Sequence, residues 1–287
     1  MATHPPEPRV YARLGQVGAR SPLVIAVPHA GRFYPPEILA AARLPQHALE
    51  TIEDRHADLL VADAVQAGAV AIVARMARAC IDLNRDEREI DPALLGGTAE
   101  PGALLASVKV AGGLGVIPSR IAAGGAVWAR PLGPEEIERR MDEIHRPYHG
   151  AIAQAMDEAQ AVHGIAILID CHSMPPLGGR SGNAQVVIGD RHGRSAEPRF
   201  VSAAIDAARR EGLTVARNHP YAGGHTLDRH GAPRAGRHAI QIEVDRSLYL
   251  DARLRTPTDG LAGARRLIAA IAAALEDEAP GHLLAAE

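Results

Sequence analysis

The chain has 287 residues, of which 47% are hydrophobic, so it can bury a sizeable core in one large α/β domain or two small ones. Its formal net charge is −3 and no basic run stands out, which argues against nucleic acid or an anionic membrane surface as a partner. No apolar run reaches the ~18 residues of a membrane span, and residues 1–10 lack the apolar core of a signal peptide.

The two cysteines, Cys80 and Cys171, both lie in apolar runs rather than in a disulfide framework. This usage fits a reducing compartment, and we expect a cytoplasmic protein. Residues 1–21 are expected to form an N-terminal extension, and residues 22–280 a single domain without internal repeats or a linker.

The first predicted strand is Leu23–Val27, which runs into Pro28-His29-Ala30-Gly31. Proline and glycine end the strand, and Gly31 permits a tight turn. His29 is therefore the first polar side chain at a strand terminus, either as a turn histidine or as a metal ligand.

A helical pattern follows over residues 46–67, with a charged stretch from Glu53 to Asp58 towards its start. These charges indicate either a solvated helix face or a carboxylate that reaches a metal from the helix, Asp54 or Glu53 being the candidates. Asp58 lies one turn beyond Asp54, on the same helix face.

Two further strands are predicted at Ala69–Val73 and Ala79–Leu83, and the second ends in Asn84-Arg85. Because a guanidinium binds a carboxylate through two parallel hydrogen bonds, this pair suits carboxylate recognition. The alternative is a surface ion pair of Arg85 with Asp86 or Glu87. The Gly-rich residues 96–133 predict loops with short strands, which often form a wall or a lid of an active site. Arg120 within them is a second candidate ligand for an anion.

Pro134 opens a long amphipathic helix, which Pro147 is predicted to kink and Gly164 to end. The apolar run that follows, Ile165–Ile169, leads directly into Asp170, Cys171, His172 and Ser173. Such a run predicts a strand of a parallel sheet buried on both faces. Ligands of open α/β sheets bind outside the carboxyl ends of strands, so His172 is a candidate metal ligand. Cys171 should point to the opposite face, which argues against a Cys–His catalytic pair.

The second half predicts strands at 184–188, 213–217 and 239–244 and helices at 198–211 and 257–278. In the last strand Gln241 and Glu243 alternate with Ile240, Ile242 and Val244. A carboxylate on an inner strand is costly unless it is paired or functional, and the alternative is an exposed edge strand. The alternation of strands and helices predicts a doubly wound, mostly parallel or mixed sheet with helices on both faces.

Four predicted strands thus carry His29, Asn84-Arg85, His172 and Glu243. Two histidines and a carboxylate with one open position form a catalytic zinc set. The compact pattern of two histidines four residues apart around a glutamate is absent, so distant segments would have to assemble any such site. The residues alone therefore favour an α/β metal-dependent hydrolase.

Seven short motifs lie between about residue 22 and about residue 254: Pro28–Gly31, Asp54–Asp58, Asp82–Arg85, Arg146–His149, Asp170–Ser173, Gly223-Gly224 with Arg229 and Gly231, and Ala239–Glu243 followed by Tyr249. No single motif is decisive, but their order and spacing together are specific. In this order and spacing the chain resembles the N-formylglutamate amidohydrolase family, the deformylases of histidine breakdown.

This resemblance implies a single three-layer α/β/α domain related to zinc carboxypeptidases, and a Zn²⁺-dependent enzyme that cleaves N-formyl-L-glutamate to formate and glutamate. His29, Asp54 and His172 match the metal ligands, and Glu243 matches the general base. Arg32 stands where carboxypeptidases have a glutamate ligand, so Glu53 and Asp58 remain alternatives to Asp54.

The resemblance also assigns Asn84 and Arg85 to the substrate carboxylate, and we expect Arg120 or Arg229 to bind a second carboxylate. The local pattern from Tyr221 to His225 departs from the family. The acyl group therefore stays open, and hydrolysis of another N-acyl amino acid or a carboxypeptidase-like exopeptidase is the alternative. Another divalent metal could replace zinc, and the sequence does not reveal the oligomeric state.

Overall fold

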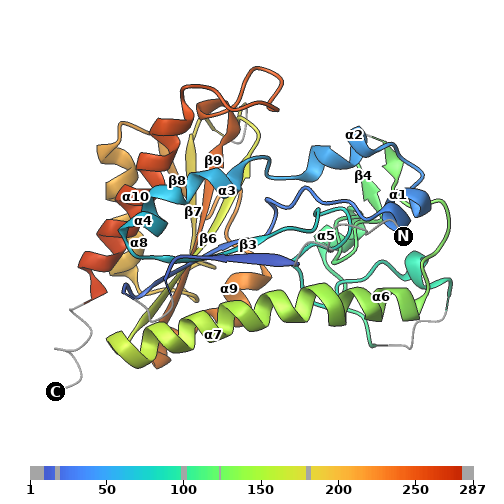
Figure 1. Cartoon of the computed structure of the whole chain (residues 1–287), viewed down its shortest axis with the longest axis horizontal. Helices are drawn as coiled ribbons and strands as arrows, with labels where there is room; N and C mark the ends of the chain where they lie inside the picture. The colour runs from blue at the N-terminus through green and yellow to red at the C-terminus, as the bar shows by residue number, and fades with distance from the viewer. Residues whose placement is uncertain (1–9, 17–19, 98–101, 123, 179–181, 280–287) are drawn as a thin grey trace, which may run out of the picture. The chain divides into compact units, whose positions relative to one another are not determined.

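The computed structural model describes residues 10–16, 20–97, 102–122, 124–178 and 182–279 (Figure 1). Two compact units are interleaved along the chain. The first unit comprises residues 1–12, 29–53 and 73–150, and the second comprises residues 13–28, 54–72 and 151–287. Of the expected extension, residues 1–9 and 17–19 lie outside the described part, whereas Tyr11–Leu14 forms a strand, β1.

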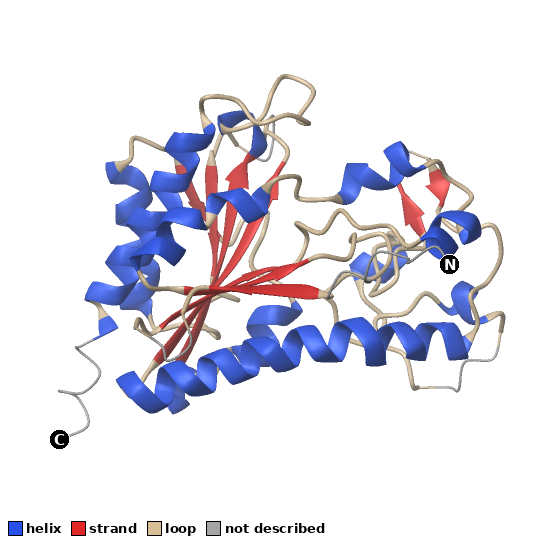
Figure 2. Cartoon of the chain, viewed as in Figure 1, coloured by secondary structure: helices blue, strands red, loops and turns tan. Residues whose placement is uncertain are grey.

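In the described part of the chain, seven strands form one sheet in the order β1-β3-β2-β6-β9-β7-β8. β2 and β9 both run parallel to β6, β7 runs antiparallel to β9, and β8 runs parallel to β7. The prediction of a mostly parallel, mixed sheet is therefore confirmed (Figure 2). The remaining strands are β2 Leu23–Val27, β3 Val70–Ala74, β6 Ala166–Met174, β7 Val186–Gly189, β8 Val215–Arg217 and β9 Arg237–Asp245.

Helices of the second unit flank this sheet on both sides. α10 (Leu261–Asp277) packs on α8 (Pro198–Arg210), α4 (Ala62–Ala67) and α3 (Ala57–Leu60). α9 (His225–His230) contacts β6 and β9, and Figure 1 shows it across the strands from α10. This is the three-layer α/β/α arrangement that we expected.

The apolar faces explain the packing of the longest helices. α10 buries Leu267, Ile268, Ile271 and Leu275, which are spaced three or four residues apart. No helix of the described residues combines the length and the apolar character that a membrane span requires.

The helix that begins at Pro134 ends at Gly164, as predicted, and its α-helical geometry is interrupted just before Pro147. α6 (Pro134–Arg140) continues through a π-helical turn, Met141–His145, into α7 (Arg146–His163). Proline lacks an N–H donor and its ring crowds the preceding turn. The wider π turn just before Pro147 absorbs that conflict, and a π turn is a common site of such local distortion.

The prediction of a strand at Ala79–Leu83 is wrong. The segment is buried in the first unit without strand pairing, and its backbone is held by single contacts: Asp82 N–H donates to the Val116 carbonyl, and Arg140 donates to the Cys80 carbonyl. An apolar run can be buried without the hydrogen-bond ladder of a strand when other groups satisfy its backbone.

The other elements of the first unit are α1 Pro36–Ala41, α2 Gln46–Leu49, 3₁₀ turns at Glu50–Ile52 and Pro92–Leu95, α5 Val108–Ala111, and the hairpin of β4 Arg120–Ile121 and β5 Gly125–Ala126.

The predicted helix over residues 46–67 is also broken. Its pattern is divided among α2, a 3₁₀ turn, α3 and α4, with irregular backbone at Glu53–His56. His56 adopts a left-handed conformation with φ 61°, which ends helical geometry for a non-glycine residue. Asp54 consequently lies in a loop before α3 rather than on a helix.

Candidate active site

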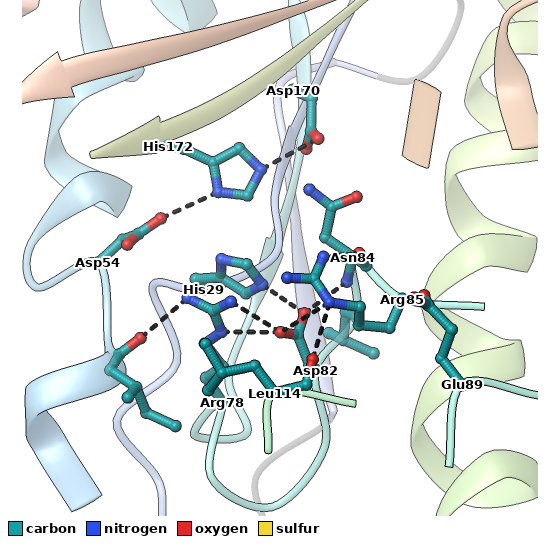
Figure 3. A network of polar contacts seen from close by, with 12 residues as sticks. His29, Asp54, Arg78, Asp82, Asn84, Arg85, Glu89, Leu114, Asp170 and His172 are labelled. Carbon is teal, nitrogen blue, oxygen red and sulfur yellow. Dashed lines mark hydrogen bonds and ion pairs between the residues drawn. The ribbon is translucent and has the colours of Figure 1, made fainter. Parts of the chain in front are cut away.

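His172 lies on β6, which runs through the polar residues to Met174 instead of ending before them. Side chains alternate along a strand, so Asp170 and His172 share one face while Cys171 and Ser173 share the other. The His172 ring is buried between two carboxylates (Figure 3): Nε2 lies 3.0 Å from Asp170 Oδ2, and Nδ1 lies 3.0 Å from Asp54 Oδ2.

The electrostatic setting of this imidazole is anionic. Burial alone disfavours its charged form, but the carboxylate of Asp170, then those of Asp54 and Glu243, outweigh burial and raise the pKa of His172 well above its usual value. The site therefore attracts a proton or a metal cation to the ring.

Asp54 is the carboxylate that reaches His172. Its Oδ1 accepts a hydrogen bond from Arg246 Nη2 at 2.7 Å, while its Oδ2 accepts one from the Ser173 N–H at 3.3 Å and faces the His172 ring. Asp58, one of the two alternatives, is half-buried on α3. The other alternative, Glu53, belongs to the first unit, where it accepts a hydrogen bond of 2.5 Å from the Tyr34 hydroxyl.

Glu243 lies beside His172 on the neighbouring strand. The two are register partners in the β6–β9 pairing, and Asp170 is in the same way the partner of Gln241. Partners in a parallel pair point to the same face, so these four side chains form a polar square on the two strands. Gln241 Nε2 donates to Glu243 Oε1 at 3.1 Å within it.

This placement decides between the two interpretations of Glu243. β9 lies between β6 and β7 in the sheet, so the edge-strand alternative is wrong. Glu243 is 8% exposed, and a buried carboxylate without a role would cost several kcal/mol unless paired.

His29 belongs to the first unit, where it contacts a second buried carboxylate. His29 Nε2 lies 2.7 Å from Asp82 Oδ1. Arg78 and the Asn84 N–H hold Asp82 from other sides, at 2.8–2.9 Å (Figure 3). Burial raises the pKa of a carboxyl group, but Arg78, His29 and then Arg85 outweigh it and hold the pKa of Asp82 well below its usual range.

Arg85 is buried and fixed by backbone carbonyls rather than engaged in a surface ion pair. Its Nε donates to the Leu114 carbonyl at 3.0 Å, and its Nη1 donates to the Asn84 carbonyl at 2.6 Å. Asp86 and Glu87, the partners of the alternative interpretation, instead bind Arg88 and Arg146. The guanidinium is thus held in one orientation, as carboxylate recognition requires.

The loop that carries Arg85 is itself fixed by two buried histidines. His145 Nε2 lies 2.9 Å from the Arg85 carbonyl, and His149 Nε2 lies 2.9 Å from the Leu83 carbonyl. The other two arginine candidates are exposed: Arg120 on β4 donates to the Ala111 carbonyl at 2.6 Å, and Arg229 lies on α9.

Within the second unit the structure therefore brings Asp54, His172 and Glu243 together, and within the first unit it places His29 and Arg85 around Asp82. Asp82, Asp170 and Arg246 are not among the site residues predicted from the sequence. Asp82 and Asp170 each begin one of the motifs, Asp82–Arg85 and Asp170–Ser173, and this position could have marked them as site residues. Arg246 lies three residues after Glu243, outside these motifs, and only its contact with Asp54 shows that it belongs to the site.

Cys171 is buried on the opposite face of β6 from His172. Burial, followed by the neighbouring carboxylates of Asp170, Asp54 and Glu243, raises the pKa of its thiol. Because a nucleophilic cysteine requires an accessible thiolate, this geometry argues against a Cys–His hydrolase.

The family model described as N-formylglutamate amidohydrolase matches residues 21–250. The chain belongs to this family. It is 30% identical over 241 residues to the N-formylglutamate deformylase of Pseudomonas aeruginosa, covering 81% of this chain and 83% of the relative. The deformylase of Pseudomonas putida is 28% identical over 243 residues, with the same coverage.

A crystal structure of N-formylglutamate amidohydrolase from Ralstonia eutropha JMP134 has the same fold, with a TM-score of 0.87 and 31% identity over 96% of this chain and 99% of that one. This N-formylglutamate amidohydrolase family member is accordingly a hydrolase that acts on an amide.

Proposed function

We propose that this chain hydrolyses N-formyl-L-glutamate to formate and glutamate, as in histidine degradation, with a divalent metal ion bound, Zn²⁺ being the expected one. The names of the relatives support the substrate. The observation that carries the proposal is the environment of His172, whose ring lies between Asp170 and Asp54 with Glu243 beside it.

The donor set of the second unit fits a metal. A neutral imidazole and a carboxylate are the ligands zinc prefers after cysteine, and the His172 Nδ1–Asp54 Oδ2 separation of 3.0 Å suits two ligands of one ion. Metal-binding histidines usually donate the other ring N–H to a carboxylate. Asp170 Oδ2 is placed to accept a hydrogen bond from the Nε2–H of His172, so Nδ1 is the ligand atom in this proposal.

His29 is the proposed second histidine ligand. It has the same kind of carboxylate partner as His172, because Asp82 Oδ1 is placed to accept a hydrogen bond from His29 Nε2. Connectivity supports it as well. Ala26 on β2 is the register partner of Asp170 on β6. β2 ends at Val27, so His29 follows the carboxyl end of the strand that pairs with β6. In this proposal His29, Asp54 and His172 hold the ion.

When bound, such an ion supplies a water of lowered pKa and polarises the formyl oxygen. Glu243 acts as the general base: it accepts the proton of the attacking water and delivers it to the leaving amine. Gln241 Nε2, bound to Glu243 Oε1, orients this carboxylate.

The substrate is recognised through its carboxylates. Arg85, with Asn84, binds one carboxylate, and two backbone carbonyls hold the guanidinium in place for that task. Arg120 or Arg229 binds the second carboxylate. An anionic N-acyl amino acid is therefore the proposed substrate class.

The test combines metal analysis with a formate-release assay on purified protein. Wild-type protein should contain a divalent ion and release formate from N-formyl-L-glutamate faster than it releases acetate or succinate from the N-acetyl and N-succinyl analogues. Glu243→Ala should keep the metal and lose turnover. Preferred cleavage of another acyl group, or of short peptides with a free carboxyl end, would replace the proposed substrate, and full activity in the Glu243→Ala variant would refute the base.

A further inference from the structure

The segment that follows β9 holds the loop containing Asp54. Tyr249 donates from its hydroxyl to the Arg55 carbonyl at 2.9 Å, and His56 Nε2 lies 3.1 Å from the Arg255 carbonyl. These two contacts fix the backbone on the C-terminal side of Asp54. The Asp54 side chain has contacts of its own: Oδ2 meets the Ser173 N–H and His172 Nδ1, and Oδ1 meets Arg246.

Arg246 is anchored before it reaches Asp54. Its Nε donates to Ser173 Oγ at 3.0 Å, and its Nη2 donates to the Ser173 carbonyl at 3.1 Å. Its backbone begins a 3₁₀ turn, Arg246–Leu248, that Asp245 caps by accepting from the Ser247 N–H at 2.8 Å. Only 10% of the Arg246 side chain is exposed. Its guanidinium therefore has little freedom to move.

The two oxygens of Asp54 consequently face different groups. Oδ1 accepts the 2.7 Å hydrogen bond from Arg246 Nη2, whereas Oδ2 faces Nδ1 of His172. A carboxylate can bind a cation through one oxygen or through both. A fixed guanidinium on one oxygen removes the second choice.

We propose that Arg246 is a positioning residue that occupies Oδ1 of Asp54 and leaves Oδ2 as the one oxygen that this carboxylate offers to a cation. The inference rests on the proposed metal site and deepens it. It is distinct from a merely structural ion pair, because a buried pair that only stabilises the fold would have no effect on how many oxygens bind the ion.

The experiment loads wild-type protein and the Arg246→Gln variant with Co²⁺ and records the visible spectrum per bound ion. The absorption of Co²⁺ weakens as its coordination number rises. Freed from Arg246, Oδ1 can join Oδ2 on the ion, so we expect the variant to show about half of the wild-type absorbance or less. Arg246→Met, which keeps the aliphatic stem, is the second variant in case the first does not fold, as checked by circular dichroism.

Tyr249→Phe is the matched control. It removes the hydroxyl that donates to the Arg55 carbonyl and contacts the Ser173 side chain, while the Arg246 guanidinium and both oxygens of Asp54 are kept, and its spectrum should equal that of the wild type. An unchanged spectrum in the folded Arg246 variant, no Co²⁺ binding by it, or an equal change in Tyr249→Phe would each overturn the inference.

The same measurement separates this inference from the proposed function. If wild-type protein binds neither Co²⁺ nor Zn²⁺, the metal site falls and the role of Arg246 falls with it. If wild-type protein binds the ion and releases formate while Arg246→Gln keeps the wild-type spectrum, only the role of Arg246 is lost.

Discussion

Replacement of Asp170 by asparagine tests whether this carboxylate tunes His172 for metal binding. Asparagine keeps the shape of the side chain and can still accept a hydrogen bond from Nε2, 3.0 Å away in the wild type. It removes the negative charge in a place where both residues are buried, with Asp170 0% and His172 2% exposed. The substitution therefore weakens the hydrogen bond to Nε2 and removes the negative charge that most raises the pKa of His172.

The size of the effect follows from that bond. A hydrogen bond to a charged group contributes ~1.5–3 kcal/mol and a neutral one ~0.5–1.5 kcal/mol, so the loss is about 1–1.5 kcal/mol. Because 1.4 kcal/mol is tenfold in an equilibrium constant, Asp170→Asn should weaken Zn²⁺ binding by about tenfold. This lies at the lower end of the roughly 10–100-fold cost of losing an outer partner of a metal-binding histidine.

The assay is competition for Zn²⁺ with a chromogenic chelator, repeated at alkaline pH values because protons and metal compete for His172. The control is Asp190→Asn, which alters another buried aspartate of the same unit. Arg217 donates to Asp190 at 2.6 Å and Asn218 at 2.5 Å, so this variant should lose stability and keep its Zn²⁺ affinity. An Asp170→Asn affinity equal to that of wild type, or equal losses in both variants, would refute the reasoning.

Three further substitutions probe the rest of the chain. Ile169→Ala on β6, 0% exposed, should lower the free energy of unfolding in urea by ~2–5 kcal/mol, and a loss well below this range would mean that the site collapses around the smaller side chain. Arg85→Lys should raise KM about tenfold with kcat nearly kept, because lysine lacks the planar fork that the Leu114 and Asn84 carbonyls hold; a change confined to kcat would contradict carboxylate binding. Cys171→Ser should retain formate release, and complete loss of turnover in a folded variant would restore the Cys–His interpretation.

The strands of the sheet centre were predictable because burial on both faces leaves a continuous apolar run. Leu23–Val27 and the Ile-rich start of β6 have this signature, and the structure confirms both. The alternation of Gln241 and Glu243 with isoleucines likewise predicted that β9 has one apolar and one polar face. What the sequence did not give is the register, in which His172 lies level with Glu243. Register depends on both strands at once, so it is not encoded in either one alone.

The errors arose where distant contacts override a local pattern. Helical spacing over residues 46–67 is real, yet the backbone breaks at His56, whose ring contacts the Arg255 carbonyl 199 residues further along the chain. The run Ala79–Leu83 is apolar enough for a strand, but Val116 and Arg140 satisfy its backbone instead. Both breaks lie beside proposed functional residues, Asp54 and Asn84-Arg85, which is where local sequence rules are expected to fail.

The two faces of β6 and β9 divide stability from chemistry. On one face Ile167, Ile169, Ile240 and Ile242 are fully buried and supply apolar contacts. The other face carries the four polar residues of the square, Asp170, His172, Gln241 and Glu243. Their burial in the centre of the sheet does not stabilise the fold through apolar contacts. Each of them has a hydrogen-bonding or register neighbour within the square, so the desolvation cost is offset only while the whole square is intact. A single substitution on this polar face should therefore disturb the neighbouring polar side chains. A substitution on the isoleucine face should act mainly through packing. The contrast arises because successive side chains of a strand point to opposite faces.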